Sequence, residues 1–508
     1  MACTHRGARN TGDLPGRPEG QRTHQGVRPR QESEGPIVPQ KPGNAGGGKG
    51  PWFGHAFRKA KGGRGLAAGL ATPERIRKLR GKLYAKAKQD RDYRFYSLID
   101  KVWREDVLAY AWLLCKANGG APGTDGQTFS DIEAEGLEGW IRKISEEVRT
   151  GAYRPSPVRR VKIPKPDGEG RRPLGIPTIR DRVVQTAARI VLEPIFEADL
   201  DEAAYGYRPG RSALEAVEKV HRSLIRGQVQ VVDADVSAYF DTIPHAGLMR
   251  CLARRIADGE MLHLIKMWLK SPVEETDEQG RKNLRGGKGS KRGVPQGGPL
   301  SPLLANLYMN RYLKTFRRRG LAQRYGAELV VYADDLVILC GRGAEEVLEI
   351  TRRWMGVMGL ELNEAKTRVL DARRERFCFL GYAFGPFRAS RTGRPYLGAA
   401  PSPAALRRLK REVRAILHAG NNDPWEEVVA ELNRLIKGWN NYFCYGTLGK
   451  TRRAVDNFVY DRTLRFLRRR RKLNTRGTRR LPGRVVFGEL GVLSSKSLPR
   501  KRYAHAMA

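Results

Sequence analysis

The sequence has few features that would cross-link the chain or hold it in a membrane. Its six cysteines are scattered without a C-x-x-C pair, which argues against a disulfide framework and a zinc knuckle. No apolar run approaches the roughly 18 residues of a membrane span, and the N-terminus lacks the apolar core of a signal peptide. We therefore expect a cytoplasmic protein with no membrane partner.

Acidic residues are scarce relative to basic ones. Lys and Arg number 95 against 54 Asp and Glu, which gives a formal net charge of +41 over 508 residues. A polyanionic partner would relieve the self-repulsion of such a chain, so nucleic acid is the leading candidate. The length is sufficient for roughly two to four domains with a substantial core.

The first 70 residues have almost no apolar periodicity. They are rich in Gly, Pro, Arg and Gln, and cannot bury enough surface to offset the entropy of ordering, so 1–70 is predicted to be a disordered basic leader. Thr72 as N-cap and Pro73 predict the start of a helix. A second helix is expected over 98–118, so that 71–118 forms an N-terminal extension.

Two strands at 158–163 and 172–176 are predicted to form a hairpin with a Pro/Gly-bearing turn. The hairpin would expose Arg159, Lys165 and Arg172. Exposed cations of this kind are often merely solvated, so the residues alone leave their role open.

Two stretches place carboxylates inside apolar, β-rich runs. "VQVVDADVSAYFD" carries Asp233, Asp235 and Asp241, and "ELVVYADDLVILC" places Asp334 beside Asp335 between two short strands. The adjacent pair could be a solvated hairpin tip. It could also join a third acid in a cage for divalent metal ions, as phosphodiester synthesis requires. Spacing alone does not choose the third acid.

The C-terminal part changes to helical patterns. One helix is predicted to open at Ser402, and a later one carries Trp439 and Phe443 on its core face. The tail from Arg462 to Arg480 has about ten basic residues and no acid, which is typical of a phosphate-contacting surface.

Five motifs together resemble a known family. In chain order they are "DVSAYFD" at 235–241, "PQGGPLSPLLANLYMN" at 295–310, "YADD" at 332–335, "LNEAKT" at 362–367 and "FLGY" at 379–382. They resemble the palm motifs of reverse transcriptases, and most closely those of the bacterial group II intron-encoded reverse transcriptase and maturase. The resemblance extends over roughly three quarters of the chain, through "LIKGWNNYF".

The resemblance implies an α+β fold, the right-hand polymerase, followed by an α-helical thumb or maturase domain. Fingers and palm would occupy 119–396, the thumb or maturase domain 397–450, and a basic DNA-binding segment 451–508. The implied function is RNA-directed DNA polymerase and intron maturase, which binds group II intron RNA, assists its splicing and copies it into DNA during retromobility.

The resemblance also implies a metal site for two Mg²⁺ ions. It assigns Asp235, Asp334 and Asp335 as the catalytic carboxylates, with Val236 in the same metal-binding set. This choice favours Asp235 over Asp233, and the repulsion within the adjacent pair would be offset by the cations.

Six further residues are implied to bind the nucleotide: Lys165, Arg172, Arg159, Phe240, Gln296 and Lys366. Lys165 and Arg172 would grip the triphosphate, with Arg159 as a weaker third. Phe240 would clash with a ribose 2′-hydroxyl, Gln296 would lie near the nascent base pair, and Lys366 near the departing pyrophosphate. The alternatives are a core aromatic for Phe240, a structural turn for Gln296 and a helix-surface lysine for Lys366.

The implied partners are intron RNA, an RNA template, a DNA primer, dNTPs and target DNA, with a homodimer left open and a location at the bacterial nucleoid. The late sequence has no Cys after Cys444 and only His505 as a late His, so we expect neither an HNH endonuclease nor RNase H. Priming would then come from nascent strands at a replication fork.

Two other functions share these motifs. A domesticated group II-like reverse transcriptase in phage defence or repair would have the same palm. An RNA-binding splicing maturase with a dispensable polymerase is the other alternative, although the complete set of three acids argues against loss of synthesis.

Overall fold

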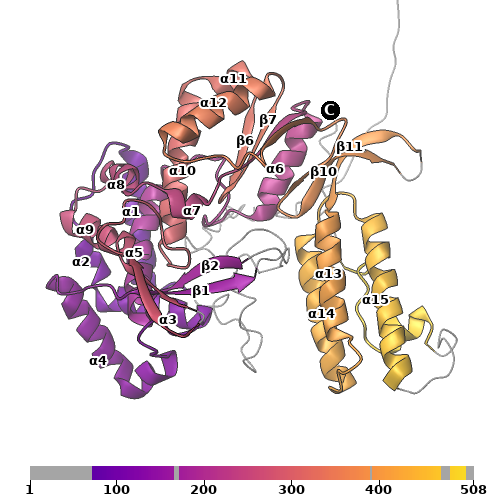
Figure 1. Ribbon diagram of the computed structural model, residues 1–508, viewed down its shortest axis with the longest axis horizontal. Coiled ribbons are helices and arrows are strands. Elements are labelled where there is room, and N and C mark those ends of the chain that lie inside the picture. Colours follow the sequence, from indigo (N-terminus) through magenta and orange to yellow (C-terminus); the bar gives the residue numbers. More distant parts are fainter. Residues whose placement is uncertain (1–70, 165–170, 278, 390–391, 471–480, 499–508) are drawn as a thin grey trace, which may run out of the picture. The chain divides into compact units, whose positions relative to one another are not determined.

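A computed structural model of the chain describes residues 71–164, 171–277, 279–389, 392–470 and 481–498. The expected leader 1–70 and the fingertip residue Lys165 lie outside these ranges. Within them the structure is mixed helix and sheet (Figure 1), so the predicted α+β class is confirmed. None of the described helices is both long enough and apolar enough to cross a bilayer.

Helices form the N-terminal part of the described chain. They are α1 (Glu74–Gln89), α2 (Ile99–Val102), α3 (Glu105–Asn118) and α4 (Phe129–Arg149). The single helix expected over 98–118 is wrong: Arg104 has extended backbone angles and separates α2 from α3, while its guanidinium pairs with Asp106 at 2.7 Å. Thr72 is not the N-cap, because Pro73 takes that place and the Thr72 hydroxyl bonds Tyr110 instead.

The predicted fingertip hairpin is present as β1 (Val158–Pro164) and β2 (Arg171–Ile176). It belongs to a four-stranded sheet of order β2-β1-β4-β5, completed by β4 (Pro272–Thr276) and β5 (Lys282–Gly286). The long helix α5 (Ile179–Glu197) follows the hairpin, and almost all of its side chains are buried because α1 and α3 pack against it.

The palm sheet has the order β6-β7-β3-β8. Its strands are β3 (Gln230–Asp235), β6 (Glu328–Tyr332), β7 (Asp335–Cys340) and β8 (Arg368–Asp371), all antiparallel to their neighbours. Side chains of one face join the core of α10 (Ser301–Arg318) and α12 (Ala344–Val357), while the other face packs on α6 (Ala213–Ile225). Both faces are therefore buried, which explains why the strand sequences are continuous apolar runs.

A second, three-stranded sheet leads into the C-terminal helices. Its strands are β9 (Phe377–Phe379), β10 (Tyr382–Arg388) and β11 (Pro395–Pro401), in the order β11-β10-β9. The helices α13 (Pro403–Ile416), α14 (Trp425–Tyr442) and α15 (Gly449–Arg470) pack side by side (Figure 1). Ser402 caps α13 as predicted, and Trp439 and Phe443 are core residues at 6% and 1% exposure.

The remaining described elements connect these parts: α7 (Tyr239–Thr242), α8 (His245–Ala253), α9 (Gly259–Leu269), α11 (Leu321–Arg324) and the π-helical turn η2 (Val485–Glu489). The boundary expected between 450 and 451 falls at the first turn of α15, so the described start of the basic segment continues the helical bundle.

Candidate active site

The adjacent acids lie where β6 turns into β7. Asp335 is the first residue of β7, and it faces Tyr332 of β6 on one side and Asp235, the last residue of β3, on the other. Directly opposed residues of antiparallel strands have Cα atoms about 5 Å apart. The fold thus brings Asp235 and Asp335 together across 100 residues of sequence, and Asp334 lies in the turn beside them.

This turn has an unusual backbone. Ala333 has φ of 61°, in the left-handed region that L-residues rarely adopt, and its amide lies against Gly206. A Cβ added at Gly206 would lie 2.7 Å from the Ala333 nitrogen. Strained conformations of this kind persist only where the surrounding structure fixes them, and they cluster at functional sites.

The Asp235 carboxylate is bound by the "LNEAKT" segment. Lys366 Nζ lies 3.3 Å from Asp235 Oδ2, and the Asn363 side-chain amide donates to the same oxygen at 3.3 Å. The Asn363 backbone N–H donates to the Asp235 carbonyl at 2.7 Å. Lys366 is therefore placed beside Asp235. It lies in a turn before β8, so the helix-surface alternative for Lys366 is wrong.

These residues fit divalent cations. The candidate donors are the carboxylate oxygens of Asp235, Asp334 and Asp335 and the backbone carbonyl of Val236, the residue after β3, and hard cations such as Mg²⁺ prefer oxygen ligands. The ammonium of Lys366 beside Asp235 shows that this position attracts positive charge. Across the described ranges, no three Asp, Glu, His or Cys side chains converge closely enough to hold an ion by themselves.

The other two candidate acids have different surroundings. Asp233 lies opposite Val337, and its carboxylate is 3.7 Å from the guanidinium of Arg368 on β8. Asp241 lies in α7, where Gln296 Nε2 donates to its Oδ2 at 3.0 Å. Burial raises the pKa of Asp241, while the nearby charges of Arg160 and Arg172 and the Gln296 bond oppose that shift.

The loop carrying Gln296 is attached to the fingertip hairpin. The Gly175 N–H of β2 donates to the Gln296 carbonyl at 2.6 Å. Gly297 has φ of 125°, and a Cβ there would lie 2.0 Å from the Gly175 carbonyl oxygen, so only glycine allows this approach. The contact joins the loop to the strand that carries Arg172.

Arg172 lies near Asp241 and Tyr207. Burial raises the pKa of both residues, and the positive charge of Arg172 opposes both shifts. Arg159 lies opposite Ile176 in the hairpin, and its Nε is buried without a hydrogen-bond partner among the described residues. The structure gives no position for Lys165.

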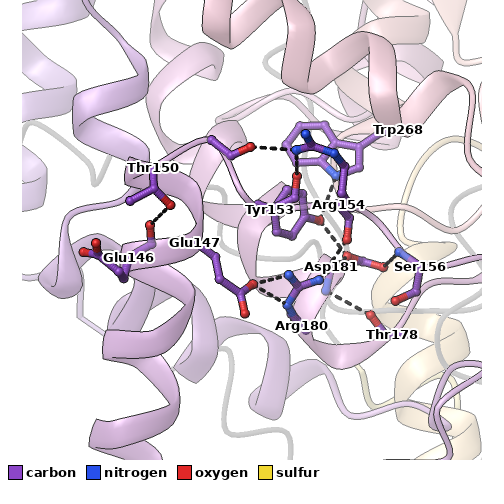
Figure 2. Close-up of polar contacts among 11 residues, drawn as sticks. Glu146, Glu147, Thr150, Tyr153, Arg154, Ser156, Thr178, Arg180, Asp181 and Trp268 are labelled. Carbon is purple, nitrogen blue, oxygen red and sulfur yellow. Dashed lines mark hydrogen bonds and ion pairs between the residues drawn. The ribbon is translucent and has the colours of Figure 1, made fainter.

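A buried polar network supports the base of this hairpin (Figure 2). The Tyr153 hydroxyl donates to Asp181 Oδ1 at 2.6 Å, and Trp268 Nε1 donates to the Tyr153 hydroxyl at 3.1 Å. The Ser156 N–H, two residues before β1, donates to Asp181 Oδ2 at 3.0 Å. Burial raises the pKa of Asp181, and these hydrogen bonds oppose the shift.

Tyr207, which lies beside Phe240, is a residue that sequence reasoning missed. Its ring meets Phe240 edge to face, with centroids 6.3 Å apart at 84°. Burial raises the pKa of Tyr207 first, and the charge of Asp334 raises it further. Only an aromatic residue after a glycine in "YGYRPG" marks it, and that pattern is too common to identify a site residue.

Two families match the chain, one after the other. Residues 163–384 match the family described as reverse transcriptase (RNA-dependent DNA polymerase), and residues 406–482 match the group II intron maturase-specific domain. Protein YkfC of Escherichia coli is 32% identical over 345 residues, which cover 60% of this chain and 87% of YkfC.

The chain belongs to the group II intron-encoded reverse transcriptase and maturase family. The group II intron-encoded protein LtrA of Lactococcus lactis is 35% identical over 242 residues, 47% of this chain and 37% of LtrA. A putative COX1/OXI3 intron 1 protein of Saccharomyces cerevisiae is 27% identical over 326 residues, 54% of this chain and 38% of that protein. The chain thus spans little more than a third of these two relatives.

Membership in the family confirms the predicted class. The chain is a reverse transcriptase with a maturase domain of group II introns, and its enzyme class is RNA-directed DNA polymerase. The reverse transcriptase family implies dependence on divalent metal, and the two domains imply nucleic-acid substrates that include intron RNA.

Proposed function

We propose that the chain synthesises DNA on its intron RNA at the site formed by Asp235, Asp334 and Asp335. The observation that supports this best is the strand register, which sets Asp235 opposite Asp335 beside the turn that carries Asp334. As part of the same proposal we assign fingers and palm to 119–396 and the thumb or maturase domain to 397–482, because α15 crosses the boundary expected at 450 and the maturase-specific match extends to 482. The DNA-binding role expected for 451–508 would then belong to basic residues of this domain and of the residues that follow it.

Two Mg²⁺ ions would be held by the three carboxylates and the Val236 carbonyl. Bound there, they would activate the primer 3′-hydroxyl and neutralise the triphosphate. The chain's own residues position the reactants. Lys366, 3.3 Å from Asp235 and with a side chain that is 59% exposed, would bind the departing pyrophosphate.

The nucleotide would lie between the fingertip hairpin and the palm. Arg172 would bind its triphosphate, with Arg159 and Lys165 assisting, because a guanidinium forms a bidentate fork with phosphate oxygens. Gln296, attached to Asp241 and to Gly175, would line the nascent base pair. Phe240, only 7% exposed, would exclude a 2′-hydroxyl.

Primer extension on an RNA template with dNTPs and Mg²⁺ tests this assignment. Asp235→Asn should lower the extension rate by about 100-fold or more, since it removes a charge at the reacting centre. Asp233→Asn is the matched control, because it changes the same strand two residues away and should leave the rate within about threefold. Equal losses in both variants would contradict the assignment of Asp235.

For intron RNA we propose a basic surface on α13 and α15, made of Arg414, Arg462, Arg465 and Arg469. Burial lowers the pKa of Arg462, and the charges of the other three lower it further. Arg414, Arg465 and Arg469 are exposed. Like charges held this close cost energy that RNA phosphates would relieve.

Binding of group II intron RNA across a salt series tests that surface. Arg465→Gln should weaken binding and reduce the slope of log K against log salt by about 0.7 to 0.9 if it contacts one phosphate. Arg353→Gln on α12, also exposed, is the control and should leave the slope unchanged. An unchanged slope for Arg465→Gln would place the RNA elsewhere.

A further inference from the structure

Tyr207 lies beside Phe240 and follows Gly206, which packs on the turn at Ala333, and the sequence motifs do not account for it. We propose that Tyr207 is a specificity-determining residue, whose ring holds Phe240 in the position that excludes a 2′-hydroxyl from the incoming nucleotide. The proposal rests on the function proposed above, because it requires that Phe240 face the nucleotide sugar. It adds a second residue to the recognition of the sugar.

The backbone before Tyr207 is fixed to the active-site hairpin. Ala204 forms a parallel bridge with Val331 of β6: the Tyr205 N–H donates to the Val331 carbonyl, and the Val331 N–H donates to the Ala203 carbonyl, each at 2.8 Å. Gly206 then packs on the turn at Ala333. This segment therefore extends the palm sheet by one short pairing, next to the catalytic acids.

Two further side chains fix the segment from the other side. The buried Asn306 of α10 donates to the Gly206 carbonyl at 2.6 Å. Arg208 donates to the carbonyls of Asp201 and Ala204 at 2.6 and 2.8 Å and pairs with Glu197 at 2.7 Å. Tyr207, between them, has φ of 59°, a left-handed conformation that is costly for an aromatic residue.

The Tyr207 ring consequently lies beside Phe240, with ring centroids 6.3 Å apart. Burial raises the pKa of Tyr207, the charge of Asp334 raises it further and that of Arg172 opposes the shift, so both charged groups lie near this ring. Among the described residues, none forms a hydrogen bond with the Tyr207 hydroxyl. A phenol at this place is available to a ligand.

Phe240 is held between two aromatic rings. Tyr207 meets it edge to face at 6.3 Å, and Tyr239 does so at 5.8 Å and 69°. Tyr239 is anchored, because its hydroxyl donates to the Ala305 carbonyl at 2.6 Å. Removing the Tyr207 ring would therefore leave space on that side of Phe240, while Tyr239 would still block the other side. Phe240 could then turn into this space, and the proposed nucleotide pocket would admit a ribose.

The test is the ratio of kcat/KM for a dNTP to that for the matching rNTP, in single-nucleotide extension of a primed RNA template. Tyr207→Ala should lower this ratio by about tenfold or more, as expected when a pocket wall loses its bulk. Tyr207→Phe keeps the ring and should stay within about threefold of wild type. Tyr207→Asn covers the case in which the alanine variant does not fold, because Asn tolerates the left-handed backbone.

Phe240→Ala serves as the reference variant. If Phe240→Ala lowers the ratio and the Tyr207 ring-removal variants do not, the proposal for Tyr207 is overturned while the assignment of Phe240 stands. If Phe240→Ala leaves the ratio unchanged, the proposed pocket itself is wrong. A merely structural role would slow both nucleotides alike and keep the wild-type ratio, which also overturns the proposal.

Discussion

Replacing Gly206 by alanine should displace the active-site hairpin. The new Cβ would lie 2.7 Å from the Ala333 nitrogen and 3.2 Å from the Tyr332 carbonyl carbon, and both are backbone atoms that cannot rotate away. Since Cβ contacts under 3.0 Å are essentially never found, the two segments must separate by at least about 0.3 Å. Overpacking of this kind costs about 1–3 kcal/mol of unfolding free energy.

The catalytic loss should exceed the loss of stability. A displacement near 1 Å can cost about 100-fold in rate, so a smaller shift of the turn that carries Asp334 should lower kcat by about 10-fold or more. Primer extension gives kcat, and urea unfolding gives stability. Gly81→Ala in α1, where a Cβ meets nothing within 4 Å, is the control. A Gly206→Ala enzyme with kcat within twofold of wild type would refute this reasoning.

Three other predictions concern the framework of the site. Glu193→Leu should destabilise the fold by about 3–5 kcal/mol in urea unfolding. The reason is that the buried Arg80, 2% exposed, loses the carboxylate that lies 2.7 Å away. As the control, Glu146→Ala breaks an exposed ion pair with Arg149 and should cost less than about 1 kcal/mol. Asp181→Asn should cost about 1.5–3 kcal/mol, since the amide replaces a charged acceptor of two hydrogen bonds; an unchanged unfolding midpoint would contradict that role. Burial lowers the pKa of His221 below its ordinary value of 6.5, so the unfolded chain takes up the proton first and stability should fall as pH drops below about 6.5. Unfolding curves of His221→Gln should lack that part of the pH dependence, and identical curves would contradict it.

The sequence was sufficient for the elements that its local pattern determines. The apolar runs on either side of Asp334 and Asp335 predicted the two short strands found as β6 and β7, because a strand buried on both faces is apolar throughout. The fingertip hairpin followed from its turn residues in the same way. Local signals failed where one residue decides a boundary: Thr72 was expected as the N-cap of α1, but Pro73 takes that place and the Thr72 hydroxyl bonds Tyr110 instead.

The candidate site depends on contacts that no local pattern contains. Spacing left Asp233, Asp235 and Asp241 as alternatives, and only the register of β3 with β7 sets Asp235 opposite Asp335. The motif "FLGY" shows the same limit, because its left-handed Leu380 and Gly381 separate β9 from β10. The position of Tyr207 depends on pairing with a strand more than 120 residues later, so it was missed.

Primer extension by the purified protein, with an RNA template, Mg²⁺ and dNTPs, tests the central claim most directly when wild type is compared with Asp334→Ala. The account predicts complementary DNA from the wild type and none above background from a variant with the same thermal unfolding midpoint. Undiminished synthesis by Asp334→Ala, or no synthesis by a folded wild type that binds the template, would contradict it.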